Sequence, residues 1–159
     1  MKKILLIGGD SRLAKVFFNK YKSNKTFKIQ KTTRRPQKKN FIFLNLNDIS
    51  KFNNYNGYDT VVIIGGVVDY YECEKNYRYA KKVNCSNIPA LAKKFLTNGS
   101  HVIFISTNTV FKSNKTIPDE KSKTCPGFKY AKMKDIAEKK LLKLKNKYNK
   151  ITILRLSIH

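Results

Sequence analysis

The chain has 159 residues, 41% of them hydrophobic, which is enough for one domain with a hydrophobic core. An excess of 34 lysine and arginine residues over 10 aspartate and glutamate residues gives a net charge of +24. Such a charge attracts nucleic acid, anionic lipid or phosphorylated metabolites. The basic residues are scattered through every segment, whereas a nucleic-acid footprint concentrates them on one element. We therefore expect a solvated basic surface and keep nucleic-acid binding as a less favoured alternative.

The cysteine pattern and the N-terminal residues exclude several further classes of protein. Three cysteines without C-x-x-C spacing, and only two histidines, argue against a disulfide framework and a zinc site, so we expect free thiols and no metal. The first apolar run, Ile4 to Ile7, is far shorter than a signal-peptide core or a membrane span. We expect a cytoplasmic protein with no membrane partner.

Short apolar segments recur along the chain with helical patterns between them. Continuous apolar strands suit a sheet covered on both faces, and intervening helices imply parallel crossovers. We expect an α/β fold with a doubly wound parallel sheet and its sites at the carboxyl ends of the strands. The predicted strands are Lys3–Ile7, Phe27–Thr32, Phe41–Leu44, Thr60–Ile64, Val102–Ser106 and Ile151–Leu156. The predicted helices are Ser11–Tyr21, a long segment around Lys75–Leu96 interrupted near Pro89, and Phe128–Tyr148.

The first predicted strand runs into a glycine turn within "ILLIGGDSRLAKVFF", residues 4–18. A glycine pair followed by a helix start can bring backbone N–H groups and the positive helix end against a pyrophosphate. In the G-x-x-G-x-x-G frame only Gly8 is a glycine, because Ser11 and Ala14 occupy the other two positions. An ordinary strand-to-helix turn with Ser11 as N-cap explains the stretch about as well.

Tyr130 and Lys134 are spaced for acid–base chemistry on one face of the last predicted helix. A neighbouring ammonium stabilises a phenolate and lowers the phenol pKa from about 10, so the tyrosine can exchange a proton with a carbonyl or alcohol. The Y-x-x-x-K spacing occurs at three other places in this lysine-rich chain, so spacing alone does not select a site. This pair follows "ISTNTVF", residues 105–111, which places the hydroxyl of Thr107 at a strand end. We favour a catalytic role over a half-buried tyrosine beside a solvated lysine.

Several segments together resemble the extended, nucleotide-sugar-modifying branch of the short-chain dehydrogenase/reductase superfamily, most of all the dTDP-4-dehydrorhamnose reductases. The resemblance runs from Lys2 to about Ser157 and rests on the order and spacing of its segments. They are "ILLIGGDSRLA", "NLND", "DTVVIIGGVVDYYECEKN", "VNCSNIPALA", "ISTNTVF", "PGFKYAKMK" and "ILRLS". It implies one NAD(P)-binding Rossmann-type domain over residues 1–159.

The resemblance also implies a chemistry, namely hydride transfer between a nicotinamide and a keto or hydroxyl carbon of a nucleotide-linked sugar. Thr107 would orient the substrate oxygen, Tyr130 would relay the proton, and Lys134 would hold the nicotinamide ribose. The pyrophosphate would lie on Gly8, Gly9, Asp10, Ser11, Arg12 and Leu13. The adenine would lie between Asn45 and Leu46, and Gly65, Gly66 and Val67 would line the cofactor after the fourth strand.

The residues after the second strand bear on the choice of cofactor. NAD-preferring relatives carry an aspartate near the position of Thr32, whereas this chain has Arg34 and Arg35 close by. The arginine fork fits a 2′-phosphate, so we predict NADP(H) over NAD(H). The competing interpretation is two more solvated cations in a very basic protein.

The resembled enzymes continue beyond "ILRLS" into a smaller lobe that closes over the sugar nucleotide. We expect that C-terminal substrate lobe to be absent from this chain, which leaves activity open. A truncated gene, a partner chain that supplies the lobe, and a domain that binds a dinucleotide without catalysis are the alternatives. Bare apolar surface also favours self-association, so a homo-oligomer is an expected partner.

Overall fold

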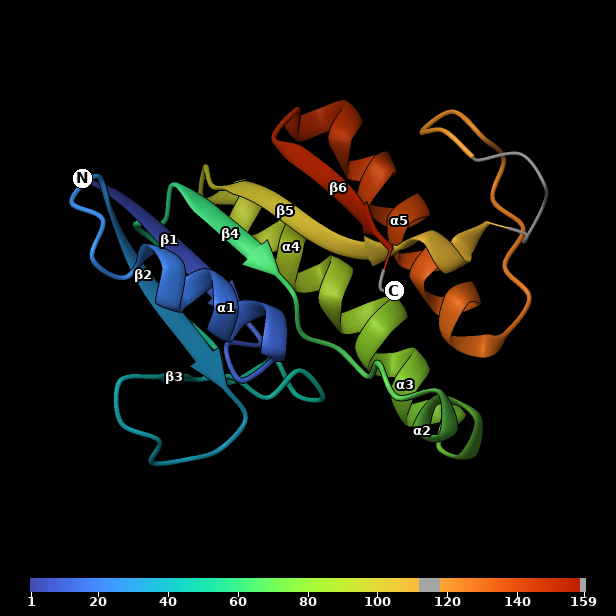
Figure 1. The fold of residues 1–159 in the computed structure, drawn as a ribbon, viewed down its shortest axis with the longest axis horizontal. Coiled ribbons are helices and arrows are strands. Elements are labelled where there is room, and N and C mark those ends of the chain that lie inside the picture. Colours follow the sequence, from blue (N-terminus) through green and yellow to red (C-terminus); the bar gives the residue numbers. More distant parts are fainter. Residues whose placement is uncertain (112–117, 158–159) are drawn as a thin grey trace.

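The computed structural model describes residues 1–111 and 118–157, and its centre is a parallel sheet. The strand order in that part of the chain is β3-β2-β1-β4-β5-β6 (Figure 1). The strands are β1 (Lys2–Ile7), β2 (Phe27–Thr33), β3 (Ile42–Phe43), β4 (Thr60–Ile63), β5 (His101–Thr107) and β6 (Ile151–Leu156). The order reverses at β1, whose neighbours are β2 and β4, and loops after neighbouring strands diverge at such a reversal to leave a crevice. The expected doubly wound fold is confirmed.

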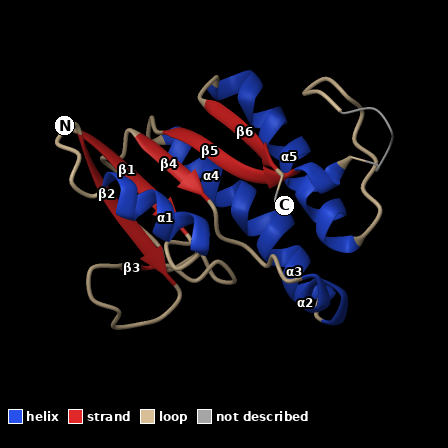
Figure 2. Ribbon diagram, viewed as in Figure 1, coloured by secondary structure: helices blue, strands red, loops and turns tan. Residues whose placement is uncertain are grey.

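The helices lie on both sides of the sheet (Figures 1 and 2). Helix α1 (Arg12–Tyr21) lies in front of β1 and β2 in the view of Figure 1, and α4 (Ile88–Thr97) lies behind the sheet. Helix α5 (Lys129–Tyr148) connects β5 to β6 and packs against α4. Before α4 come α2 (Tyr70–Lys75), α3 (Tyr77–Lys81) and a π-helical turn η1 (Lys82–Asn87), and the short helix η2 (Asn108–Val110) follows β5.

The long helical segment differs from its sequence prediction at one place. The break lies at Asn76, between α2 and α3, and not near Pro89. Pro89 is the second residue of α4, which continues directly from the π-helical turn, and the Ile88 N–H beside it donates to the Val83 carbonyl. The chain widens into the π-helical turn just before it, so the proline follows a change of helix type without ending the helix.

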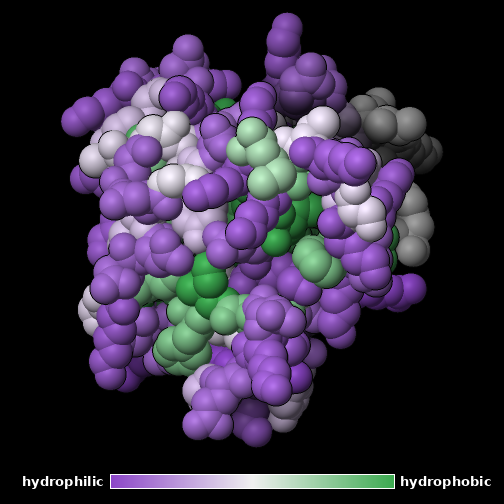
Figure 3. Space-filling model, turned by 90° about the vertical axis from the view of Figure 1, so that its left-hand side faces the viewer, coloured by the Kyte–Doolittle hydropathy of each residue, from purple (hydrophilic) through white to green (hydrophobic). Residues whose placement is uncertain are grey.

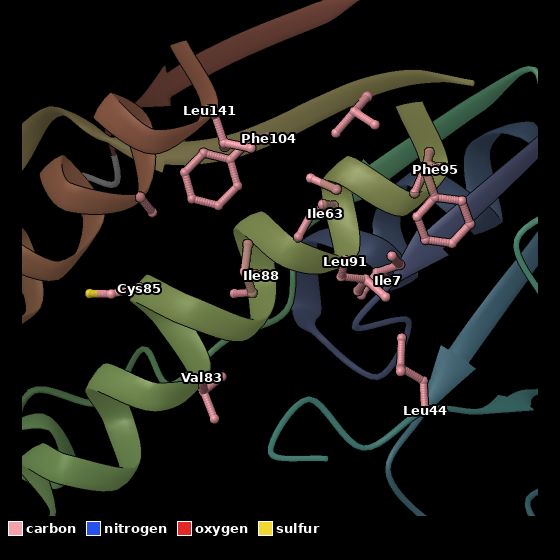
Figure 4. Packing of buried hydrophobic residues seen from close by; sticks show 14 of the residues in the cluster. Ile7, Leu44, Ile63, Val83, Cys85, Ile88, Leu91, Phe95, Phe104 and Leu141 are labelled. Atoms are coloured by element: carbon pink, nitrogen blue, oxygen red, sulfur yellow. The ribbon is translucent and has the colours of Figure 1, made fainter. Parts of the chain in front are cut away.

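The main core fills the space between the sheet and the α4 side. Phe95 of α4 is fully buried and contacts Phe52, Tyr55 and Tyr58 of the β3–β4 connection, with ring centroids 5.1 to 6.2 Å apart. Figure 4 shows Ile88 and Leu91 on the same helix near Ile7 and Ile63 of the strands. This packing fixes where the strand ends, and hence the loops that follow them, lie.

The outer surface is mainly hydrophilic, as the charge predicts. Figure 3 shows mostly hydrophilic residues around a smaller hydrophobic area near the middle of the face. In residues 1–111 and 118–157, none of the helices is both long and apolar enough to span a membrane.

Candidate functional site

A cleft of about 730 Å³ opens beside the point where the strand order reverses. Four loops supply most of its wall, each after a different strand. The lining residues are Gly8, Asp10 and Ser11 after β1, 32–35 at the end of β2, 44–47 after β3, 64–69 after β4, and Glu72, Tyr79 and Val83. The carboxyl ends of parallel strands at a reversal are where ligands bind in open α/β sheets.

The glycine turn allows two backbones to meet at the floor of this cleft. Gly8 has a φ of +83°, and a Cβ there would lie 2.5 Å from the Cα and N of Gly65. A side chain at residue 8 is therefore excluded by both strain and space. The Ile7 carbonyl accepts hydrogen bonds from the N–H groups of Ile64 (3.0 Å) and Gly65 (2.8 Å), which hold the two turns together.

The positive end of α1 faces this floor. Ser11 is the N-cap, and its hydroxyl oxygen accepts from the N–H of Ala14 at 3.2 Å. Remaining first-turn N–H groups have no partner within the helix, so this end can receive an anion. The N-cap that the alternative interpretation of this turn requires is present, and Ser11 also lines the cleft.

Three residues predicted to hold the pyrophosphate do not line the cleft. Gly9 is buried against β2, where its N–H donates to the Thr32 carbonyl (2.9 Å) and a Cβ would lie 2.6 Å from Cβ of Lys31. Arg12 and Leu13 lie in the first turn of α1 and are exposed. The structure thus brings Gly8, Asp10 and Ser11 together with the other loops and leaves these three outside.

The loops after β3 and β4 are fixed by two asparagines. Asn87 donates from Nδ2 to the carbonyls of Leu46 (2.8 Å) and Asn47 (3.1 Å). Asn84 accepts from the Val67 N–H (3.1 Å) and donates to the Val67 carbonyl (2.9 Å). Asn45, Leu46, Gly65, Gly66 and Val67, all predicted to contact the cofactor, therefore share one wall of the cleft.

The end of β2 carries a charged group that reaches back to the glycine turn. The Asp10 carboxylate accepts hydrogen bonds from the Thr33 hydroxyl and the Lys38 ammonium. Burial acts to raise the pKa of Asp10, but these two hydrogen bonds and the positive charges of Lys38 and Arg35 outweigh it and lower the pKa. Arg34 and Arg35 line the same end of the cleft and are exposed.

Tyr130 and Lys134 lie close together but outside the cleft. Their residues are 8% and 4% exposed. The Lys134 ammonium donates to the Ile105 carbonyl at 2.8 Å and lies 5.9 Å from the centroid of the Tyr130 ring. The spacing therefore does place both groups on one face of α5, near the end of β5.

The pKa of Tyr130 is shifted in the direction opposite to the prediction from sequence. Burial, assisted by Tyr70 and Cys73, raises it to about 12. Burial likewise lowers the pKa of Lys134 to about 8, against the opposing effects of Glu138 and Cys73. The predicted lowering of the phenol pKa is wrong for this closed arrangement, because burial is the largest cause and Tyr70 and Cys73 raise the pKa in the same direction.

Aromatic side chains cover Tyr130. The Tyr70 ring centroid lies 5.2 Å from that of Tyr130, and Phe128 lies 4.9 Å from Tyr70 and 6.3 Å from Tyr130. Tyr70 itself is 53% exposed, so it forms the outer layer. Thr107 is buried at the end of β5, where its hydroxyl oxygen accepts from the Thr109 N–H at 3.2 Å. In this arrangement the three predicted catalytic residues are enclosed.

Comparison with known proteins identifies the family. The family model described as the RmlD substrate binding domain matches residues 1–158. The chain belongs to this family. No curated protein sequence matches the chain significantly.

Solved structures show the same fold in longer proteins. A hypothetical dTDP-4-dehydrorhamnose reductase from Sulfolobus tokodaii has a TM-score of 0.83 at 19% identity, covering 99% of this chain and 56% of its own. A dTDP-4-dehydrorhamnose reductase from Clostridium acetobutylicum gives 0.80 at 24% identity, with coverages of 96% and 52%. The Bacillus anthracis reductase, solved in complex with NADP, gives 0.81 at 19% identity, with coverages of 99% and 54%. This RmlD-family chain therefore spans about half the length of these structures.

One buried cluster of this RmlD-family chain was missed by sequence reasoning. Glu138 is 1% exposed, and its carboxylate accepts from the Ser106 hydroxyl and from the Arg155 guanidinium, at 2.7 Å from Nη2. Glu138 lies four residues beyond Lys134 on α5, and that spacing is the signal that could have found it. Among the residues that the structure describes, no cluster of three or more His, Cys, Asp or Glu could hold a metal ion.

Proposed function

We propose that the chain binds a nicotinamide dinucleotide, NADP(H) in preference to NAD(H), as the dinucleotide-binding part of a nucleotide-sugar oxidoreductase. The observation that carries the proposal is the cleft where the strand order reverses, with the Gly8 and Gly65 backbones in contact and the capped end of α1 at its floor. Neighbours of the same fold support it, because their structures hold NADP or NAD.

The lining residues suggest how the dinucleotide lies. The diphosphate faces Gly8, Ser11 and the backbone of Asp10 at the end of α1, where backbone N–H groups favour anions, while the Asp10 carboxylate is bound to Thr33 at the end of β2. The adenine lies against the wall formed by Asn45 and Leu46, and the nicotinamide half extends along residues 65–67. The two turns approach so closely that a Cβ on Gly8 or Gly65 would meet the other glycine's backbone within 3.1 Å, and the cleft of about 730 Å³ beside them has room for a cofactor. Gly9, Arg12 and Leu13 then act from outside the cleft, by shaping the turn.

The preference for NADP(H) rests on charge at the end of β2. Arg34 and Arg35 line this end of the cleft, and a guanidinium can donate two parallel hydrogen bonds to a phosphate. The structure adds no carboxylate on β2 itself to accept from a ribose hydroxyl, since residues 32 and 33 are threonines. Binding of NADPH that is no tighter than binding of NADH would contradict this preference.

The chemical step is proposed for Thr107, Tyr130 and Lys134. When bound, the nicotinamide supplies or accepts the hydride. Tyr130 exchanges a proton with the substrate oxygen, Thr107 orients that oxygen, and Lys134 holds the cofactor ribose. This requires the Tyr70 ring to move away from Tyr130, because Tyr130 is only 8% exposed. A nucleotide-linked sugar is the proposed substrate class, which is supported by neighbours of the same fold solved with UDP-glucose or UDP-glucuronic acid. A second copy of the chain or a partner chain is proposed to contribute to the sugar site.

A charge introduced at the helix cap tests the cofactor site. Aspartate is as good an N-cap as serine, so Ser11→Asp keeps α1 capped while placing a negative charge against the diphosphate. We expect NADPH binding, measured by isothermal titration calorimetry, to weaken about tenfold or more. Ser23→Asp, which adds the same charge at an exposed residue outside the cleft, should leave the Kd unchanged. Equal affinities of the two variants would contradict the proposed site.

A separate experiment tests the chemistry. We expect single-turnover oxidation of NADPH by 4-keto sugar nucleotides to fall about 100-fold or more in Tyr130→Phe, since this change removes the proton donor. NADPH affinity should stay within about twofold. Binding of NADPH without oxidation by any member of the panel would favour a non-catalytic dinucleotide-binding domain.

A further inference from the structure

Asp10 lies where a carboxylate can influence the adenosine ribose, although it comes from an unusual part of the chain. In dinucleotide-binding sheets the acidic residue that contacts the ribose 2′-hydroxyl stands at the end of the second strand. Here β2 ends in two threonines, and the Asp10 carboxylate reaches that end from the glycine turn. Asp10 also lines the cleft together with Thr33.

The carboxylate is held in place from both sides. One oxygen accepts from the Thr33 hydroxyl and the other from the Lys38 ammonium. Thr33 in turn accepts from the Arg35 N–H at 3.1 Å, so the start of the β2–β3 loop is tied to the same group. The Lys38 ammonium also lies 4.2 Å from the centroid of the Phe41 ring. The Lys38 ammonium therefore contacts Asp10 and Phe41, and Lys38 is not among the residues that line the cleft, whereas Arg34 and Arg35 are.

The charges around the Asp10–Lys38 ion pair affect how well a 2′-phosphate binds. Lys31, Arg35 and Lys38 lie near enough to interact electrostatically with the carboxylate, and Arg34 lines the same cleft. Burial together with the charge of Lys38 lowers the pKa of Lys31, as expected for crowded cations. A 2′-phosphate placed here would be attracted by the cations and repelled by Asp10. The side chains of Asp10 and Lys38 keep 26% and 32% of their area exposed, so the pair can be rearranged when an anion enters.

We propose that Asp10 is a specificity-determining residue that restrains binding of the 2′-phosphate, because it holds the Lys38 ammonium and adds its own negative charge at the end of β2. This rests on the proposed cofactor site. The four cations outnumber the one carboxylate and therefore favour NADPH over NADH. Asp10 reduces that preference. When a 2′-phosphate binds, Lys38 exchanges Asp10 for the phosphate.

The test compares NADPH with NADH, which differ in the 2′-phosphate, on the same folded variants. Asp10→Asn keeps a side-chain acceptor for Thr33 while removing the charge that holds Lys38. We expect NADPH to bind about three- to tenfold more tightly and NADH to change less than about twofold. Asp119→Asn, an equal charge change at an exposed residue outside the cleft, should leave the ratio of the two Kd values unchanged.

Lys38 provides the second half of the test. Lys38→Gln should weaken NADPH binding, and it should do so more strongly in the Asp10→Asn background, where the ammonium is released to the phosphate. Lys39→Gln, at the exposed neighbouring residue, is the matched control. An unchanged NADPH-to-NADH ratio in Asp10→Asn, or an equal loss of both affinities, would overturn the inference and assign Asp10 a loop-holding role. Failure of the wild-type chain to bind either dinucleotide would instead overturn the proposed function, and the inference with it.

Discussion

The candidate site has an open half, the cleft around Gly8, and an enclosed half, the residues around Tyr130, and the two differ in their exposure to solvent. Around Gly8, the cleft is accessible and its floor is backbone held by glycine turns. Around Tyr130, aromatic rings cover the phenol, and burial raises the pKa of Tyr130 and lowers that of Lys134. The comparison teaches that this fold can present an open cleft at the strand ends while Thr107, Tyr130 and Lys134 stay covered.

The largest expected effect is a loss of stability when the enclosed half is changed. Glu138→Ala removes a buried carboxylate, so the Arg155 guanidinium, whose side chain is 21% exposed, loses its partner and the Ser106 hydroxyl loses its acceptor. Breaking a buried ion pair in this way costs about 3–5 kcal/mol, which urea denaturation would measure. Glu74→Ala, which removes the exposed partner of Lys129, should hardly change the free energy of unfolding. Similar losses in both variants would contradict a special role for burial.

Lys134 should make the stability of the chain depend on pH. Its folded pKa of about 8 lies below the ordinary 10.5, so above pH 8 the unfolded state binds more protons than the folded state. Stability should therefore rise between pH 8 and pH 9, by at most about 1.4 kcal/mol per pH unit from this group.

Comparison with Lys134→Met isolates the contribution of Lys134, because the rise in the free energy of unfolding between pH 8 and pH 9 should disappear in that variant. Cys73 acts in the opposite direction between pH 9 and pH 11, because burial raises its pKa from 9.0 to about 11. The measurement is therefore best made by chemical denaturation at and below pH 9. Identical pH profiles for the two proteins would show that Lys134 is not desolvated as described.

A smaller effect should follow when the enclosed half is opened. Tyr70→Ala removes the outer ring over Tyr130, so water reaches the phenol and its pKa falls from about 12 toward the ordinary 10. NMR titration with ¹³C-labelled tyrosine, assigned with Tyr130→Phe, would follow this group. Tyr71→Ala changes an exposed tyrosine beside Tyr70 and should leave the pKa of Tyr130 unchanged. A Tyr130 pKa that stays near 12 in Tyr70→Ala would show that Tyr70 does not shield the phenol.

The smallest effect is expected in the open half. Arg34→Ala should weaken NADPH binding about three- to tenfold and leave NADH binding nearly unchanged, because the side chain is exposed and its interaction is screened by solvent. Raising the salt concentration should reduce the difference between the two cofactors. An equal weakening of NADPH and NADH would place Arg34 away from the 2′-phosphate.

The fold and the open half were the more predictable parts. The apolar strands and the Ser11 cap are local patterns, and their predicted positions agree with the structure to within a few residues. Arg34, Asn45 and Gly65 could be placed at one cleft because parallel strands end at the same edge of a sheet.

The enclosed half depends on contacts between distant segments, which local patterns do not reveal. The partner of Glu138 is 17 residues away and that of Lys134 is 29 residues away. The reversed pKa shift of Tyr130 arises from burial on α5 beside Tyr70, a residue of the distant helix α2. The contact of Asp10 with Thr33 at the end of β2 could not be predicted either, because it depends on the geometry of the glycine turn.

The central claim is that the cleft beside Gly8 receives the dinucleotide, and chemical-shift mapping of the ¹⁵N-labelled chain with NADPH tests it most directly. We expect the largest changes at the amides of Gly8, Ser11, Gly65 and Gly66, saturating together with one Kd. A smaller pocket at the opposite end of the strands, lined by Lys2, Asp59 and His101, should stay unchanged. Shifts confined to that pocket, or spread evenly over the basic surface, would contradict the account.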